Sequence, residues 1–350
     1  MARFGVALLL VAALLGAGIW WLVFTPYAGF EQPVLIEIPH GTGTRRIAAL
    51  LADARVMRSG VPFLFVRALR PRANLQAGEY EFSHPDTPWH IFQRLAAGDI
   101  HYYELVVPEG SNLFDISNAL DQLGVIKGAG FVEAARRPAL VKELLADLAP
   151  DAPSLEGFLF PSTYRLTRQT TAEKLAREMV QQFRKVYGSL NGPAPALGTV
   201  TLASLVEKES AVPAERPVVA SVYSNRAAKG MKLDCDPTTI YAAMLDGRWR
   251  GAIYRSDLDS PNPYNTYRNP GLPPGPIANP GRDALQAALH PAQTSYLYFV
   301  ARPDGSGGHV FSEGLAEHAA AVAQYRRGQQ KDAPPGTGAR VPGRARVPRH

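Results

Sequence analysis

Two glutamates separated by one lysine stand near the end of an apolar segment, residues 201–210, which predicts a helix. At about 100° per residue, Glu209 falls roughly 40° from the centre of the apolar side of this helix and Glu207 roughly 120° from it. Apolar surroundings raise the pKa of a carboxyl group, which can then remain protonated near neutral pH and act as a general acid. We therefore predict Glu209 as a catalytic acid. For this helix taken alone, two solvated glutamates or an ion pair of Glu209 with Arg216 or Arg226 are the alternatives.

Polar and aromatic residues after this helix could line a cleft that binds sugars. Residues 215–226 predict a second helix, and residues 233–238 predict a turn that brings polar groups back. A proline-stiffened loop loses little entropy on ordering, so residues 271–276 could help to hold Asn265 and Tyr267 at the mouth of a cleft. Aromatic rings stack on pyranose rings and amides hydrogen-bond sugar hydroxyls, although a plain surface turn is the alternative. The candidate substrate-binding residues are Asn225, Asp236, Thr238, Tyr264, Asn265, Tyr267 and His290.

Other catalytic chemistries have no matching pattern. The spacing of His290, His309 and His318 fits no metal-ligand motif. Ser204 and Ser210 have no partner histidine pattern that would make them nucleophiles, and no glycine-rich nucleotide-binding motif occurs. We therefore expect neither a metal nor a cofactor.

Composition indicates packed cores and argues against nucleic-acid binding. Apolar residues make up 46% and charged residues 19% of the 350, which suits two or three folded units. The net charge is +6, but the last 25 residues contain seven lysine and arginine residues and one aspartate, so the remainder is near neutral. A nucleic-acid-binding domain would carry its basic surface on the fold. Cys235 is the only cysteine, which excludes an internal disulfide and favours a small core residue.

Both ends of the chain have a distinct character. Residues 4–24 carry no charge and could cross a hydrocarbon layer of about 30 Å as a helix. With residues 1–3 as a cytoplasmic head, they predict a single-pass anchor in the inner (plasma) membrane and a periplasmic remainder. A cleaved signal peptide is the alternative, but its apolar region usually spans only about 7 to 15 residues. Residues 331–350 predict a disordered basic tail, either solvated or in contact with anionic lipid or wall polymer.

Two stretches that share a pattern at an offset of 69 residues indicate a duplicated unit within residues 31–149. Each predicts a strand, a Pro/Gly turn and a helix. Between them, residues 77–82 alternate like a strand and residues 89–97 predict an amphipathic helix. The arrangement is similar to LysM-type modules, which bind glycans that contain N-acetylglucosamine; a structural spacer is an equal alternative. The two stretches are Ile38-Pro39-His40-Gly41-Thr42 and Val107-Pro108-Glu109-Gly110-Ser111.

A third region, residues 150–330, predicts an α+β catalytic domain. Its elements do not alternate as strand, helix and strand, which argues against a parallel α/β fold. The expected helices are at residues 171–187, 200–211, 215–229 and 282–289, and the expected strand is at 296–300.

Several motifs, in order over roughly residues 35–325, resemble the YceG-like endolytic murein transglycosylases. The resemblance implies a single-pass membrane anchor, LysM-like α/β units and a mixed α+β catalytic domain, with Glu209 as the catalytic residue. The family more often has an aspartate in place of Ser162, and the basic tail is an addition. The motifs are Leu155-Glu156-Gly157-Phe158-Leu159-Phe160-Pro161, Glu207-Lys208-Glu209, Asp236-Pro237-Thr238, Tyr264-Asn265-Thr266-Tyr267, Gly271-Leu272-Pro273-Pro274-Gly275 and His290-Pro291.

The resemblance implies a peptidoglycan lytic transglycosylase that cuts the bond between N-acetylmuramic acid (MurNAc) and N-acetylglucosamine (GlcNAc) inside glycan strands. It would leave 1,6-anhydro-MurNAc ends, limit the length of nascent strands and work beside peptidoglycan synthases. One alternative is a muramidase that admits water, for which Asp234 and Asp236 are the nearby candidates for a second carboxylate. The other is a non-catalytic, membrane-anchored protein that binds peptidoglycan.

Overall fold

The computed structural model describes residues 2–331, with side chains from residue 9 to residue 328, and the chain divides into two compact units. Unit 1 comprises residues 2–104 and 165–169, and unit 2 comprises residues 105–164 and 170–331. The units do not divide near residue 150, where we expected a domain boundary, because residues 105–149 lie with Glu209 in unit 2. Met1 of the expected head and residues 332–350 of the expected tail lie outside the described residues.

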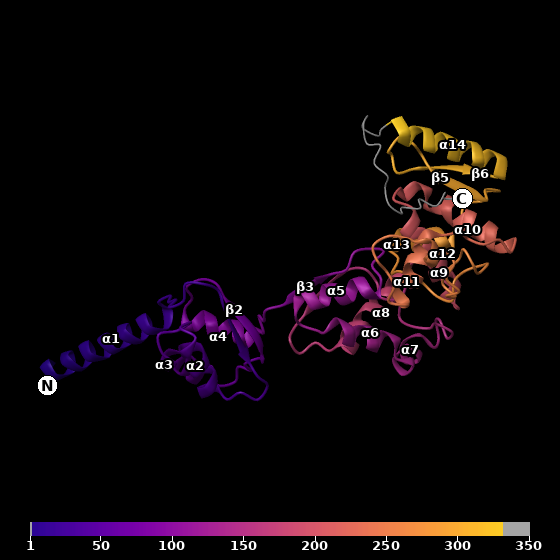
Figure 1. Cartoon of the computed structure of the whole chain (residues 1–350). Coiled ribbons are helices and arrows are strands. Elements are labelled where there is room, and N and C mark those ends of the chain that lie inside the picture. Colours follow the sequence, from indigo (N-terminus) through magenta and orange to yellow (C-terminus); the bar gives the residue numbers. More distant parts are fainter. Residues whose placement is uncertain (1, 332–350) are drawn as a thin grey trace. The chain divides into compact units, whose positions relative to one another are not determined.

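Unit 1 is a small α+β body that begins with a long N-terminal helix (Figure 1). Its two strands, β1 and β2, pair antiparallel from Val34 opposite Phe82 to Ile38 opposite Gly78. Their inward side chains join those of the helices in one core around Phe63, which is fully buried. Its elements are α1 (Ala2–Phe24), β1 (Val34–Ile38), α2 (Thr44–Asp53), α3 (Val61–Leu69), β2 (Gly78–Phe82) and α4 (Pro88–Ala97).

Helix α1 covers the segment that was expected to be helical at residues 4–24. No helix in the described part of the chain meets the length and hydropathy expected of a membrane-crossing segment. At its end, α1 packs against α3 and α4 through the buried side chain of Val23.

Both copies of the duplicated pattern form the predicted strand, turn and helix. Their turns need glycine because Gly41 and Gly110 have φ values of +79° and +76°, in the left-handed region. The first copy is β1 followed by α2, and the second is β3 (Tyr103–Val106) followed by α5 (Leu113–Leu123). In both, a second helix follows and a later strand pairs with the first, as β1 with β2 and β3 with β4 (Thr163–Leu166).

Unit 2 is largely helical, with a two-stranded sheet of β5 and β6 that pair antiparallel from Tyr298 opposite Ser312 to Ala301 opposite His309. The expected elements at 171–187, 200–211, 215–229, 282–289 and 296–300 are present with small shifts of their ends. The further elements are α6 (Gly128–Arg136), α7 (Pro138–Leu145), α8 (Ala172–Ser189), α9 (Leu197–Glu209), η1 (Pro213–Glu215), α10 (Arg216–Ala228), α11 (Asp236–Leu245), α12 (Arg255–Leu258), α13 (Arg282–Leu289), β5 (Tyr298–Ala301), β6 (His309–Ser312) and α14 (Leu315–Lys331).

Helix α9 is not amphipathic, which corrects the helix-phase argument. Every residue from Val200 to Val206 is buried because α10, α11 and α13 pack around the helix. Ser204, opposite the apolar side of the predicted helix, is fully buried, and its hydroxyl accepts a hydrogen bond from the backbone N–H of Ile277 (3.1 Å). The turn expected at 233–238 is also only partly correct, because helix α11 already begins at Asp236.

The buried carboxylate of Glu156 joins three separate parts of unit 2. It accepts hydrogen bonds from the backbone N–H of Leu113, the hydroxyl of Tyr241 and the side-chain amide of Asn279, each at 2.9 Å. Asn279 in turn accepts bonds from the N–H groups of Gly157 and Leu159. Burial raises the pKa of Glu156 to about 7 and outweighs the hydrogen bonds from Leu113 and Tyr241, which lower it.

This raised pKa predicts that unit 2 becomes less stable as pH rises from about 4.5 to about 7. In that window the folded protein keeps a proton on Glu156 that the unfolded chain has lost, so the free energy of unfolding falls with pH, by at most on the order of 3 kcal/mol. In Glu156→Gln this part of the pH dependence should vanish, as measured by urea unfolding at several pH values. Glu133→Gln, an exposed control on α6, should keep it. An unchanged slope in Glu156→Gln would contradict the assignment.

Candidate active site

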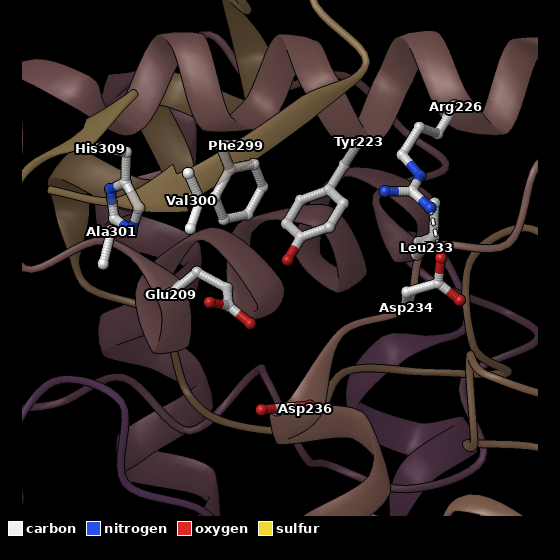
Figure 2. Close-up of a pocket in the computed structure, with 10 residues that line it drawn as sticks. All are labelled: Glu209, Tyr223, Arg226, Leu233, Asp234, Asp236, Phe299, Val300, Ala301 and His309. Carbon is white, nitrogen blue, oxygen red and sulfur yellow. Dashed lines mark hydrogen bonds and ion pairs between the residues drawn. The ribbon is translucent and has the colours of Figure 1, made fainter. Parts of the chain in front are cut away.

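Glu209 is the last residue of α9 and faces a pocket of unit 2 (Figure 2). The carboxylate of Glu209 and the hydroxyl of Tyr223 point into the same space, and Asp236 lies across it. Helices α9, α10 and α11, the turn before α11, and strands β5 and β6 supply the walls. The lining residues are Glu209, Tyr223, Arg226, Leu233, Asp234, Asp236, Phe299, Val300, Ala301 and His309.

The thiol of Cys235 is a direct partner of Glu209. Its Sγ donates a hydrogen bond to Oε1 of Glu209 over 3.4 Å. Burial, first, and the adjacent Glu209 carboxylate hold the pKa of Cys235 well above its ordinary value, so the side chain stays a thiol and keeps its proton. Cys235 is buried, as the sequence predicted, but it also supports the candidate acid.

Two neighbouring threonines fix the position of Cys235. The backbone N–H of Cys235 donates to Oγ1 of Thr266 (3.0 Å), and the hydroxyl of Thr238 donates to the carbonyl of Cys235 (2.6 Å). The two threonine hydroxyls also bond to each other at 2.8 Å. Thr238 is fully buried and its hydroxyl is engaged in this network, so the structure gives it a supporting position rather than the predicted place on the pocket wall.

Tyr223 adds a buried hydroxyl to the pocket. Burial and the nearby Cys235 and Glu209 hold its pKa well above 10, so the hydroxyl remains protonated. The ring of Phe299 meets the Tyr223 ring edge-on, with centroids 5.8 Å apart. Tyr223 is not among the residues predicted from the sequence. The sequence of a helix does not show whether an aromatic residue in it lines a pocket or packs in the core.

Arg216, one of the two arginines considered as an ion-pair partner of Glu209, pairs with Glu207. Oε1 of Glu207 accepts from Nη2 of Arg216 (3.0 Å), and Oε2 accepts from the backbone N–H of Gly281 at the start of α13 (2.9 Å). Burial raises the pKa of Glu207, against the lowering effects of the Gly281 hydrogen bond and the Arg216 charge. Glu207 is therefore a structural link between α9, α10 and α13.

The two further carboxylates of the pocket already have partners. Asp236 accepts a hydrogen bond from the hydroxyl of Tyr267 (2.6 Å), and burial and this aspartate raise the pKa of Tyr267 far above its ordinary value. Asp234 forms an ion pair with Arg226. Asp236, hydrogen-bonded to Tyr267, thus lines the same pocket as Glu209.

The remaining predicted residues lie away from the pocket lining. Asn225 uses its amide to bind the carbonyls of Thr294 and Tyr296, at 2.8 and 3.0 Å. His290 is exposed at the end of α13. Tyr264 is half-buried near Tyr241, with a pKa raised to about 12 mainly by burial.

Asn265 was expected at the mouth of a cleft, and this expectation is wrong. Its side chain is completely buried, and its amide donates to the carbonyls of Leu258 and Ser260, at 2.9 and 2.8 Å. Its Oδ1 accepts from Thr239 and from the backbone of Tyr267. Asn265 therefore stabilises its own loop, because its side chain gives hydrogen-bond partners to backbone groups that are buried there.

His309 enters the pocket from β6. Its Nδ1 lies 2.8 Å from Oε2 of Glu215, and its backbone N–H donates to the same carboxylate. Within the described residues, no group of three histidine, cysteine, aspartate or glutamate side chains could hold a metal ion.

Comparisons with known proteins identify the class to which this fold and site belong. A 2.6 Å crystal structure of a YceG-like protein from Listeria monocytogenes matches with a TM-score of 0.55 and 32% identity, covering 83% of this chain and 99% of that one. The model of the YceG-like family matches residues 36–324. The chain therefore belongs to the YceG-like family.

Two similar proteins are named endolytic murein transglycosylase. The one from Bacillus subtilis is 33% identical over 313 residues, covering 84% of this chain and 85% of that protein. The one from Streptococcus pneumoniae strain D39 is 28% identical over 330 residues, covering 85% of this chain and 59% of that protein.

The buried amide of Asn265 gives a test that separates a structural role from a binding role. Asn265→Ala leaves several buried backbone carbonyls without a donor, so we expect the free energy of unfolding to fall by about 2 kcal/mol or more. His290→Ala, at an exposed position, should change it by less than about 0.5 kcal/mol. Urea unfolding of both variants provides the measurement. Wild-type stability of Asn265→Ala would contradict the structural role.

Proposed function

We propose that this protein is an endolytic murein transglycosylase, a lyase that cleaves MurNAc–GlcNAc bonds within peptidoglycan strands and leaves 1,6-anhydro-MurNAc ends. Its membership of the YceG-like family and the names of its two relatives support the reaction class. The observation that carries the proposal is the placement of Glu209, at the end of a buried helix, in a pocket with Tyr223 and Asp236.

Glu209 supplies the proton transfers in this scheme. Its protonated carboxyl group gives a proton to the glycosidic oxygen as the bond to C1 of MurNAc breaks and an oxocarbenium-like state forms. The C6 hydroxyl of the same MurNAc then attacks C1, and the Glu209 carboxylate accepts the hydroxyl proton. The ring closes without water, and Glu209 ends in its starting state. Attack within one sugar benefits from a high effective molarity.

The pocket residues have supporting roles in this reaction. The Cys235 thiol donates to Oε1 of Glu209 and so orients the carboxyl group. The Tyr223 hydroxyl points into the same space and can hydrogen-bond a sugar or the leaving oxygen. Asp236, held by the Tyr267 hydroxyl, and the ring of Phe299 offer polar and aromatic surface for the glycan.

A muramidase, which transfers water, would need a second carboxylate beside Glu209. Asp234 and Asp236 line the pocket, but Arg226 pairs with the first and Tyr267 hydrogen-bonds the second. These two contacts restrain the side chains of both aspartates. This favours the transglycosylase reaction, which needs Glu209 as its only acid. Product mass separates the two reactions, since anhydro ends are lighter by one water.

The N-terminal sequence supports a location for the enzyme in the cell envelope. We propose that residues 4–24 form a single-pass anchor in the inner membrane, with the catalytic unit in the periplasm near peptidoglycan synthases, where cleavage would limit nascent strands. The absence of charge over these residues supports the anchor. The LysM-like interpretation of residues 31–149 applies best to the first copy, in unit 1, as either a glycan-binding module or a spacer.

Replacing Glu209 tests the central role. Glu209→Gln keeps the shape of the side chain but removes its acid, so we expect release of anhydro-muropeptides from purified sacculi to fall by about 10²- to 10⁴-fold. Glu207→Gln should remain active, although it loses the ion pair with Arg216 and unfolds more easily. Mass spectrometry of the digests is the measurement. Binding to sacculi without turnover by the wild type would instead indicate a non-catalytic peptidoglycan-binding protein.

Replacing Cys235 tests how Glu209 is oriented. Cys235→Ser retains a donor to Glu209 and should keep kcat within about threefold, whereas Cys235→Ala removes it and should lower kcat by about tenfold with little change in KM. Steady-state digestion of a soluble glycan oligomer gives both constants. Equal kcat values for the wild type and Cys235→Ala would show that the thiol is only a core residue.

A further inference from the structure

The face of α3 that points away from the core of unit 1 carries only apolar side chains. Phe63 and Val66 of this helix are fully buried in that core. Val61, Phe65 and Leu69, spaced four residues apart, lie within an arc of roughly 80° on another side. Their exposed fractions are 67%, 37% and 59%. A surface helix normally turns polar residues to water, so we name these three residues the α3 stripe and treat it as an interaction surface.

Arginines flank the α3 stripe in the sequence. Arg58 precedes it, Arg70 and Arg72 follow it, and all three are exposed. Residues 44–72 contain seven arginines and one aspartate. A folded region whose charge is near neutral in total thus has a strongly basic part at this position. Apolar side chains flanked by arginine are the pattern of a helix that lies in the surface of an anionic membrane.

The α3 stripe belongs to the helix on which the end of α1 packs (Figure 1). The guanidinium of Arg58 lies 4.7 Å from the ring centroid of Tyr27 and 5.6 Å from that of Trp21. Tryptophan, tyrosine and arginine are enriched where a membrane helix meets water. Trp21 and Tyr27, which would mark the outer interface of α1, therefore contact Arg58, which precedes α3.

We propose that the α3 stripe, with Arg58 and Arg70 at its ends, binds the surface of an anionic lipid bilayer as a second membrane contact beside α1. The inference rests on the proposed α1 anchor, because that anchor brings α3 to the surface. A single helix leaves the unit free to rotate about the helix axis, and a second contact restrains that rotation. Lipid fits this face better than a protein partner, since the arginines match anionic headgroups and α1, which packs against α3, also exposes apolar side chains.

The test uses the full chain in liposomes with an environment-sensitive fluorophore on one introduced cysteine; native Cys235 is buried and so protected from labelling. The test position is Phe65→Cys. Leu14→Cys on α1 reports insertion of the anchor. His40→Cys is the negative control. The β1–β2 ladder begins near the Tyr27–Asp86 bridge, which follows α1, and its other end is at Ile38. His40 therefore lies at the end of unit 1 that is away from α1. Lipids with a spin label near the headgroup end of the acyl chain quench fluorophores that enter the surface layer, and lipids labelled near the other end of the chain quench a fluorophore at position 14, which would lie about 15 Å deep.

In vesicles of phosphatidylglycerol and phosphatidylethanolamine we expect quenching at positions 65 and 14 and none at position 40. No quenching at position 65, with quenching at position 14, would overturn the α3 contact and leave the anchor standing. Quenching at position 65 without quenching at position 14 would support the contact and reject the anchor. No quenching at either position would overturn both. A blue shift at position 65 without quenching would mean that protein, such as a second copy of the chain, covers the stripe, which also rejects the proposal.

The charge requirement has its own matched control. Arg58→Gln with Arg70→Gln should lower quenching at position 65 in anionic vesicles to the level found in phosphatidylcholine vesicles. Arg45→Gln with Arg46→Gln removes the same charge from exposed positions on α2 and should leave quenching at position 65 unchanged. Equal effects of the two pairs would show that total charge, rather than the α3 stripe, drives the contact.

Discussion

The burial of α9 on all sides from Val200 to Val206 is the constraint on which the rest of the site depends. Helices α10, α11 and α13 pack around it, and each residue from Val200 to Val206 lies inside. A helix held on all sides cannot rotate without opening cavities, so its last residue, Glu209, has a fixed place relative to β5, β6 and the turn at Cys235. A catalytic acid needs this kind of support, since small displacements of a proton donor lower its efficiency.

Support for α9 also comes from a part of the chain far away in sequence. The turn at Gly110 lies against Glu207 and Lys208, and Nζ of Lys208 donates to the carbonyl of Gly110 (3.2 Å). Asn279 bonds the same turn through the backbone of Gly110 and Ser111 and connects it to Glu156. The second copy of the duplicated pattern is thus built into unit 2 beneath the candidate acid. This explains why the duplication does not coincide with the division into units.

Local patterns in the sequence predicted most elements of the fold. The positions of β2, α4, α8, α9, α13 and β5 follow from apolar periodicity and turn residues. Glu209 was predicted as the acid from its angular position on α9. Because that helix is buried on all sides, angular position alone does not distinguish Glu209 from Glu207. The family motifs supplied the distinction.

The rest of the site depends on long-range contacts that a single sequence does not reveal. Asn265 has a side chain that could hydrogen-bond a sugar, but its amide donates to the backbone carbonyls of its own loop. Cys235 looked like a core residue and is one, yet its Sγ also reaches Glu209 because α11 starts at the next residue. Phe299 and His309 come from strands whose pairing brings them to the pocket, and neither has a local signal.

The central claim is that Glu209 transfers the proton at the bridging oxygen between MurNAc and GlcNAc. A crystal structure of Glu209→Gln with an intact glycan oligomer tests it most directly. The account predicts that the amide of residue 209 lies about 3 Å from that oxygen, with the C6 hydroxyl of the same MurNAc turned towards C1. An oligomer bound elsewhere, or a water held by Asp234 or Asp236 opposite C1, would contradict it.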